Sequence, residues 1–91
     1  MASMEQAVGI TATMYRMRRA ARTLWGDRFD TEVAQWRAAI QKVAAHRQVS
    51  DLKATILIAQ EAQKAGQEIA VLGVFASYVE MVEPTPAPPP G

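Results

Sequence analysis

Three apolar stripes at helical spacing are the feature that most constrains how this 91-residue chain folds. Within each stripe the apolar residues recur at intervals of four and three, which places them on one face of an α-helix. The stripes are Ile10-Met14-Met17-Ala21-Leu24, Phe29-Val33-Trp36-Ile40-Val43 and Ile58-Ala62-Ala65-Ile69-Leu72. Helices of this kind bury their apolar faces against one another, so the sequence predicts an all-α fold, a small helical bundle.

The first helix is expected to begin at Ser3 or at Thr11 and to end at Trp25. Ser3 opens an S-x-x-Q capping box, but Gly9 soon afterwards costs about 1 kcal/mol relative to alanine, which favours the later start. Gly26 suits the position just past a helix end, where the backbone often needs a positive φ.

A second helix follows within a few residues, with Asp27 or Asp30 as its N-cap. Asp30 and Glu32 place negative charge at its positive end, and His46 and Arg47 have the favourable sign near the other end. Because the connection is so short, the first two helices are predicted to form an antiparallel hairpin.

The C-terminal helical region is predicted to begin at a Ser50 cap and to end before Pro84. An unbroken helix from Asp51 to Val82 would be roughly 48 Å long at 1.5 Å per residue and would overhang the hairpin. Gly66 offers a break within it. We therefore expect a C-terminal helix that is either long or split at Gly66, and the overhang favours the split.

Residues 1–83 are predicted to form one helical domain, and the Pro-rich residues 84–91 a disordered tail. A domain of roughly eighty residues gains only a small net stability from a single core. The chain has no cysteine, so no disulfide can add to it. Oligomerisation is then the usual way to bury more apolar surface.

The segment from Gln67 to Val82 is apolar around nearly its whole circumference, which is typical of a helix buried on all sides. Two short helices can hardly cover it, so part of it is expected to contact a second copy of the chain. The residues predicted for this self-association are Ile69, Leu72, Phe75, Tyr78 and Val79. The alternative is a central helix that is fully covered within the monomer.

Four arginines gather on the first helix at Arg16, Arg18, Arg19 and Arg22, and Trp25 follows them. At 100° per residue much of this face points away from the first apolar stripe. Guanidinium groups bind phosphates, so the face is a candidate for nucleic-acid contact, with Trp25 available to stack. The alternatives are an acidic protein surface, or a face that is solvated or paired within the chain.

The two tryptophans are predicted to differ in burial. Trp36 lies within the second stripe and is expected in the core, where its N–H needs an acceptor or a wet edge. Trp25 borders the first stripe beside Gly26 and is expected to be partly exposed. Of the two, Trp25 is the candidate interface residue.

Catalytic and metal-binding functions find little support in the sequence. With no cysteine and one histidine, His46, the chain has no Cys/His metal site, and no cofactor is predicted. There is no Gly-rich phosphate loop, nucleophile elbow or H-E-x-x-H motif. We do not expect an enzyme.

Location and charge complete the sequence-based description. Residues 1–13 lack the pattern of a secretory signal, and the apolar stretch 69–82 is too short to span a bilayer, so a cytoplasmic protein with no membrane partner is expected. Residues 1–47 carry eight Lys/Arg and four Asp/Glu, whereas residues 48–91 carry two and five, so the halves differ in sign. Two copies can attract each other through such halves.

The function favoured by the sequence is a non-catalytic protein–protein interaction or assembly module that binds itself, a larger partner, or both. A second hypothesis is a non-specific nucleic-acid-binding protein that uses the arginine face. A third is a small inhibitor or adaptor of a host complex, for example a bacteriophage accessory protein.

Overall fold

Four α-helices and one 3-10 turn make up residues 11–83, the part of the chain that this computed structural model describes. In chain order they are α2 (Ala12–Trp25), η1 (Gly26–Arg28), α3 (Phe29–Arg47), α4 (Asp51–Lys64) and α5 (Glu68–Val82). No strand occurs among these residues, so the predicted all-α bundle is confirmed. The capping box at Ser3, the stripe residue Ile10 and the predicted tail 84–91 lie outside the described residues.

Side-chain caps fix the starts of α2 and α4. The Met14 N–H donates to Thr11 Oγ1 at 3.1 Å, and the Lys53 N–H donates to Ser50 Oγ at 3.1 Å. Thr11 and Ser50 thereby satisfy backbone donors that have no acceptor inside their helices. Both positions agree with the sequence prediction.

The start of α3 differs from the prediction, because neither Asp27 nor Asp30 caps it. Gly26 ends α2 with a positive φ of 53°, and the chain then passes through η1 directly into α3. Arg28, at the N-cap position, has right-handed helical backbone, whereas a side-chain cap requires an extended residue there. Asp30 and Glu32 stay in the first turn of α3, where their charge is favourable.

Gly66 separates α4 from α5, which confirms the split form of the C-terminal region. The helix ends at Lys64, Gly66 has a φ of 74°, and a new helix begins at Glu68. A Cβ at Gly66 would meet no atom within 4 Å, so the backbone conformation alone favours glycine there. The break also shifts the phase of the third stripe, which leaves Ala65 and Ile69 exposed.

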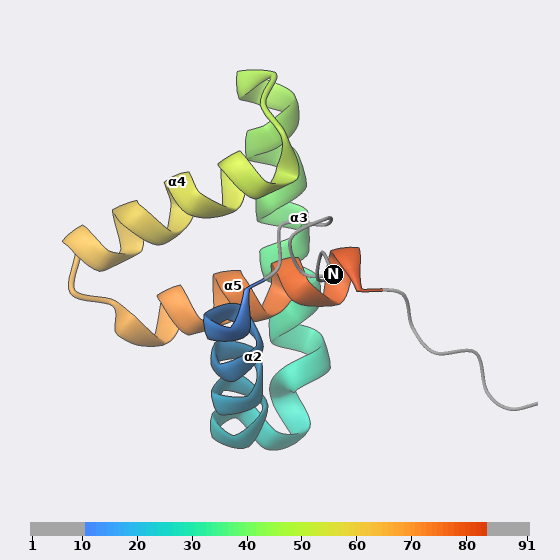
Figure 1. Ribbon diagram of the computed structural model, residues 1–91, viewed down its shortest axis with the longest axis vertical. Coiled ribbons are helices and arrows are strands. Elements are labelled where there is room, and N and C mark those ends of the chain that lie inside the picture. The colour runs from blue at the N-terminus through green and yellow to red at the C-terminus, as the bar shows by residue number, and fades with distance from the viewer. Residues whose placement is uncertain (1–10, 84–91) are drawn as a thin grey trace, which may run out of the picture.

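Helix α5 is the centre of the bundle and packs against α2, α3 and α4. In Figure 1, α2 runs down and α3 runs back up beside it, as the hairpin prediction requires, and α5 crosses both helices. The direct contact between α2 and α3 is sparse, because each packs mainly on α5. Helices α4 and α5 form a second hairpin around the turn at Gly66.

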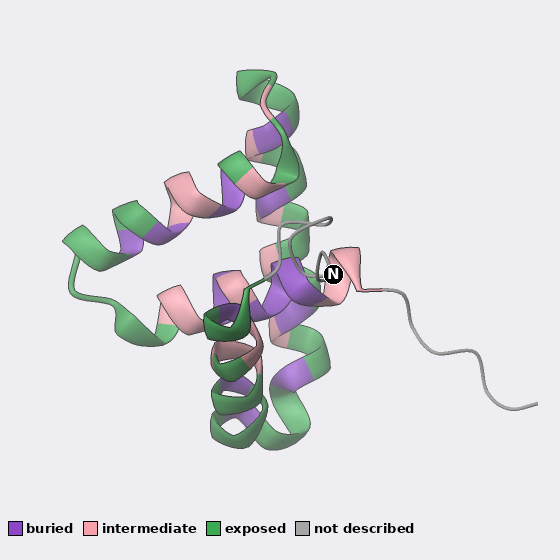
Figure 2. Ribbon diagram, in the orientation of Figure 1, coloured by how far each residue is buried: buried purple, intermediate pink, exposed green. Residues whose placement is uncertain are grey.

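Two clusters of buried side chains meet along α5, and Figure 2 shows this helix as the most continuously buried one. The larger cluster contains Met14, Ile40, Ala44, Ala54, Ala59, Val74, Tyr78 and Val79. The smaller contains Ala21, Trp25, Phe29, Val33 and Ala76. Because α5 contributes to both clusters, it joins the two hairpins into one core.

Trp25 and Leu24 are found in the opposite environments from those predicted. Trp25 is only 7% exposed, with its ring centroid 6.2 Å from that of Phe29, whereas Leu24 is 51% exposed. Gly73 on α5 makes room for the indole, since a Cβ there would overlap the Trp25 ring and lie 2.9 Å from Trp36 Nε1. Trp36 is partly buried against both clusters, which agrees with its predicted core position.

Candidate protein-interaction groove

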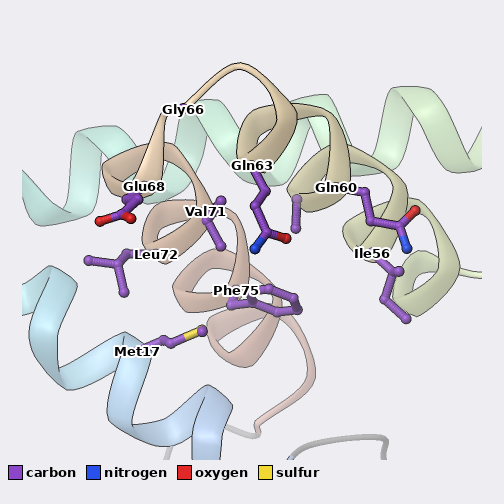
Figure 3. A pocket seen from close by; sticks show the side chains of 10 residues that line it. Met17, Ile56, Gln60, Gln63, Gly66, Glu68, Val71, Leu72 and Phe75 are labelled. Carbon is purple, nitrogen blue, oxygen red and sulfur yellow. The ribbon is translucent and has the colours of Figure 1, made fainter.

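An apolar groove of about 470 Å³ lies between α4 and α5, with one side formed by Met17 of α2. Figure 3 shows Phe75 and Val71 of α5 at its centre, Ile56 on α4, and the Met17 side chain extending toward Phe75. The full lining is Met17, Ile56, Ala59, Gln60, Gln63, Gly66, Glu68, Val71, Leu72 and Phe75. The groove exists because the first turns of α5 project beyond the hairpin of α2 and α3, so that α4 lies on one side of them and Met17 is the one lining residue from α2 (Figure 1).

The lining has few groups that could take part in acid–base chemistry. Gln60 and Gln63 of α4 supply neutral amides that can donate and accept hydrogen bonds, and Glu68 is the one lining residue that ionises. No cation lines the groove. Apolar walls with a small number of polar groups are typical of a surface that binds another apolar segment.

The five residues predicted for self-association lie in three different environments. Leu72 and Phe75 line the groove and are partly buried. Ile69 is 56% exposed and lines a separate hollow at the start of α5. Tyr78 and Val79 are buried in the core, so in the folded monomer they offer no contact surface, because α5 is covered on all sides at that level.

Burial also affects the ionisation of Tyr78. Removal from water disfavours the phenolate and raises the pKa of Tyr78 above its ordinary value, and the negative charge of Asp51 acts in the same direction. A tyrosine is neutral at ordinary pH in any case, so this shift in the pKa of Tyr78 matters only at alkaline pH. Its neutral form contributes to packing and has no evident role in chemistry at the groove.

Two of the four predicted arginines are paired with carboxylates of the same chain. Arg18 Nε lies 3.3 Å from Glu80 Oε1, and Arg18 Nη1 contacts Glu83 Oε2. Arg22 Nη2 also lies 3.3 Å from Glu80 Oε1, and its guanidinium stacks 4.4 Å from the centre of the Phe29 ring. The Arg18 and Glu80 side chains are partly exposed and that of Arg22 is 57% exposed, so such contacts stabilise the fold by about 1 kcal/mol or less.

The other two arginines face outward. Arg16 Nη2 donates to Thr13 Oγ1 at 3.4 Å, and Arg19 and Arg16 border a shallow hollow on α2 together with Ala20, Thr23 and Leu24. Within residues 11–83 neither guanidinium has a carboxylate within 4.0 Å. The predicted arginine face is thus divided into an inner pair, Arg18 and Arg22, and an outer pair, Arg16 and Arg19. Trp25 belongs to neither, since it is in the core.

Sequence reasoning did not identify the α4 side of the groove. Ile56 lies outside the stripe that contains Ile58 and Ala62, and Gln60 and Gln63 look like ordinary surface residues in the sequence. The one signal in the sequence was that Ile56 is apolar although it lies outside the helical stripe. Met17 belongs to a stripe, but its place in the groove depends on how α2 crosses α5.

Residues 11–83 contain neither a metal-binding cluster nor a membrane-spanning helix. No three or more His, Asp or Glu side chains there come close enough together to hold a metal ion. Nor does the described part of the chain contain a helix long and apolar enough to cross a membrane. Comparison of the chain with protein-family models, with curated proteins and with solved structures gives no match.

Proposed function

We propose that this protein is a non-catalytic assembly module that binds a second copy of itself through the groove between α4 and α5. The observation that carries this proposal is the composition of the groove. Apolar surface is open to solvent at Val71, Leu72 and Phe75, beside Ile56 and Met17. The lining contains a single ionisable group. Burial of such surface is favourable by about 25 cal/mol per Å².

The size of the protein supports a second copy as the partner. The core must stabilise a small domain that has neither a cysteine in its sequence nor a metal cluster among its described residues. Additional apolar burial between copies is a common route to stability for such domains. Ile69, a large aliphatic side chain left 56% exposed next to the groove, enlarges the surface that association would cover. The cysteine-free sequence suits a reducing compartment such as the cytoplasm.

Nucleic-acid binding has less support than the sequence alone provides. It relies on four arginines acting together, but Arg18 and Arg22 are neutralised by Glu80 and Glu83. Two outward arginines remain on that face, and Trp25 cannot stack on bases beside them because it is in the core. Phosphate contacts add up one by one, so halving their number greatly weakens such binding.

The proposal is tested by measuring the mass of the full chain in solution by light scattering over a range of protein concentrations. We expect a mass above that of the 10.0 kDa chain, and we expect Gln63→Arg to reduce it by placing a long charged side chain in the groove. Gln63 is exposed, so this variant keeps the core intact. Leu72→Glu should act in the same way.

The matched control is Gln41→Arg, the same change at an exposed position of α3 outside the groove. It should leave the mass unchanged. Thermal unfolding followed by circular dichroism establishes that each variant is folded. A wild-type chain that stays monomeric at every concentration would refute the proposed function.

A further inference from the structure

We propose that the segment bound in the groove is the outer face of α2 from a neighbouring copy, so that the copies associate head to tail. This inference rests on the proposed function and specifies its partner surface. The outer face of α2 consists of Arg16, Arg19, Ala20, Thr23 and Leu24, which together line one shallow hollow. It is therefore a surface distinct from the groove that would receive it.

The outer face has the pattern of a helix that binds in an apolar groove. Ala20 and Leu24 lie one turn apart, so their side chains form a short apolar ridge. Leu24 is 51% exposed, which is unusual for a leucine that continues a helical stripe, and nothing within the described monomer covers it. Arg16 and Arg19 lie at the upstream end of the ridge. Grooves that bind helices take up such ridges as anchors and use the flanking charges for orientation.

The charges of the two surfaces are complementary. The groove contains Glu68 and no cation, and Glu61 lies on the neighbouring α4 with 79% of its side chain exposed. Glu61 has one contact within the described chain, an exposed pairing with Lys64 at 3.9 Å. The outer arginines have no carboxylate partner there, as described above. Opposite charges at the edge of an interface favour encounter and fix orientation.

The monomer already contains one example of the proposed pairing. On the inner side of α2, Arg18 and Arg22 bind carboxylates at the C-terminal end of α5. The outer arginines of α2 and Glu68 at the N-terminal end of α5 are the same types of group, and within residues 11–83 none of them forms an ion pair. A groove that instead met a second groove would bring two Glu68 carboxylates to the same interface with no lining cation between them.

Head-to-tail association has a consequence that separates it from a symmetric dimer. Each copy uses two different surfaces, so each pair leaves one free groove and one free α2 face. The mass should therefore keep rising with concentration unless the chain of copies closes into a ring. A symmetric pairing of groove with groove would stop at two copies.

The decisive experiment mixes two variants that are each defective in one surface. Leu24→Glu removes the apolar anchor and introduces a charge that repels Glu68, but leaves the groove intact. Gln63→Arg obstructs the groove and leaves α2 intact. We expect each variant alone to be monomeric at a concentration at which the wild-type chain associates. We expect their equimolar mixture to give a complex with the mass of two chains, because one intact groove then meets one intact α2 face.

The controls introduce the same charged residues on α3. Ala38→Glu and Gln41→Arg lie at exposed positions that line neither surface, and both should associate like the wild-type chain. Circular dichroism and thermal unfolding confirm that all four variants fold. Exchanging the charges of the two surfaces gives a further test. The Arg16→Glu/Arg19→Glu chain should associate weakly, and adding Glu68→Arg to that chain should partly restore its association.

The outcomes distinguish this inference from the proposed function. If Gln63→Arg lowers the mass but Leu24→Glu does not, the groove binds a second copy by another surface and the α2 assignment is overturned. Variants that fail to associate both alone and in the mixture indicate a symmetric interface, which also overturns it. A wild-type monomer at all concentrations refutes the proposed function itself.

Discussion

The beginning and the middle of α5 are similarly apolar but differ in their surroundings. The middle of the helix is enclosed: Gly73, Val74 and the residues 76–79 are all buried. The beginning of the helix contains equally apolar residues, yet Ile69 is 56% exposed and Leu72 only partly buried. The difference arises because α2 and α3 pack against α5 from Leu72 onward, whereas its first turn projects beyond them (Figures 1 and 2). Apolar composition indicates that a helix will be buried, but the positions of the helices that cross it determine which part of its surface stays exposed to solvent.

The largest effect on this contrast is expected from Gly73→Ala. The added Cβ would overlap the Trp25 indole and lie 2.9 Å from Trp36 Nε1, and two rigid rings cannot both move away. Overpacking of this kind should lower the free energy of unfolding by about 3 kcal/mol. The loss of free energy of unfolding is measured by chemical denaturation. Gly66→Ala is the informative comparison, because its cost of about 1 kcal/mol comes from backbone conformation alone. Equal losses at both positions would contradict the packing explanation.

Truncation of one aliphatic side chain in each part tests the contrast directly. Val79 is fully buried, so Val79→Ala should lower the free energy of unfolding by about 2 kcal/mol through lost contacts and a cavity. Ile69→Ala should change it by less than about 0.5 kcal/mol at concentrations where the chain is monomeric. Chemical denaturation at low protein concentration measures the free energy of unfolding of both variants. A loss at Ile69 as large as that at Val79 would mean that the beginning of α5 is enclosed within the monomer.

The smallest expected effect concerns pH and is confined to the enclosed part. The pKa of Tyr78 is raised in the folded state, so the folded chain retains the phenolic proton more tightly than the unfolded chain does. That stabilisation is complete below the pKa of the unfolded tyrosine, about 10, and is lost as pH rises through the folded value. Denaturation at increasing alkaline pH should therefore show a fall in stability that Tyr78→Phe reduces. Tyr15→Phe is the matched control, and an equal reduction there would argue against Tyr78 as the source.

The fold was largely predictable because it depends on local signals. Thr11 and Ser50 cap helices in the structure as their positions in the sequence predict, and Gly66 forms the expected break. Each of these devices acts within a few residues. The Asp27 or Asp30 cap was wrong because the chain never leaves helical backbone between η1 and α3. Nothing in the spacing of these residues indicates whether a short connection will open into a loop or continue as a 3-10 turn.

The groove was only partly predictable. The sequence indicated Leu72 and Phe75 through the apolar character of their helix, and both line the groove. It also indicated Tyr78 and Val79, which are in the core, because composition alone does not show where α2 and α3 cross. Ile56 on α4 went unnoticed, since its role depends on the angle between two helices joined at Gly66.

The sequence by itself determined the helices, their ends and the faces on which apolar residues gather, because helical periodicity and capping are local. Only the tertiary structure decided between Leu24 and Trp25, which lie three and four residues after Ala21 and fit its stripe equally well. Trp25 is the one buried, because α5 passes that side and Gly73 leaves space for the indole. The tertiary structure likewise paired Arg18 with Glu83, 65 residues away, and left Arg16 and Arg19 facing outward. Partners so distant in sequence are selected by packing, which no local pattern encodes.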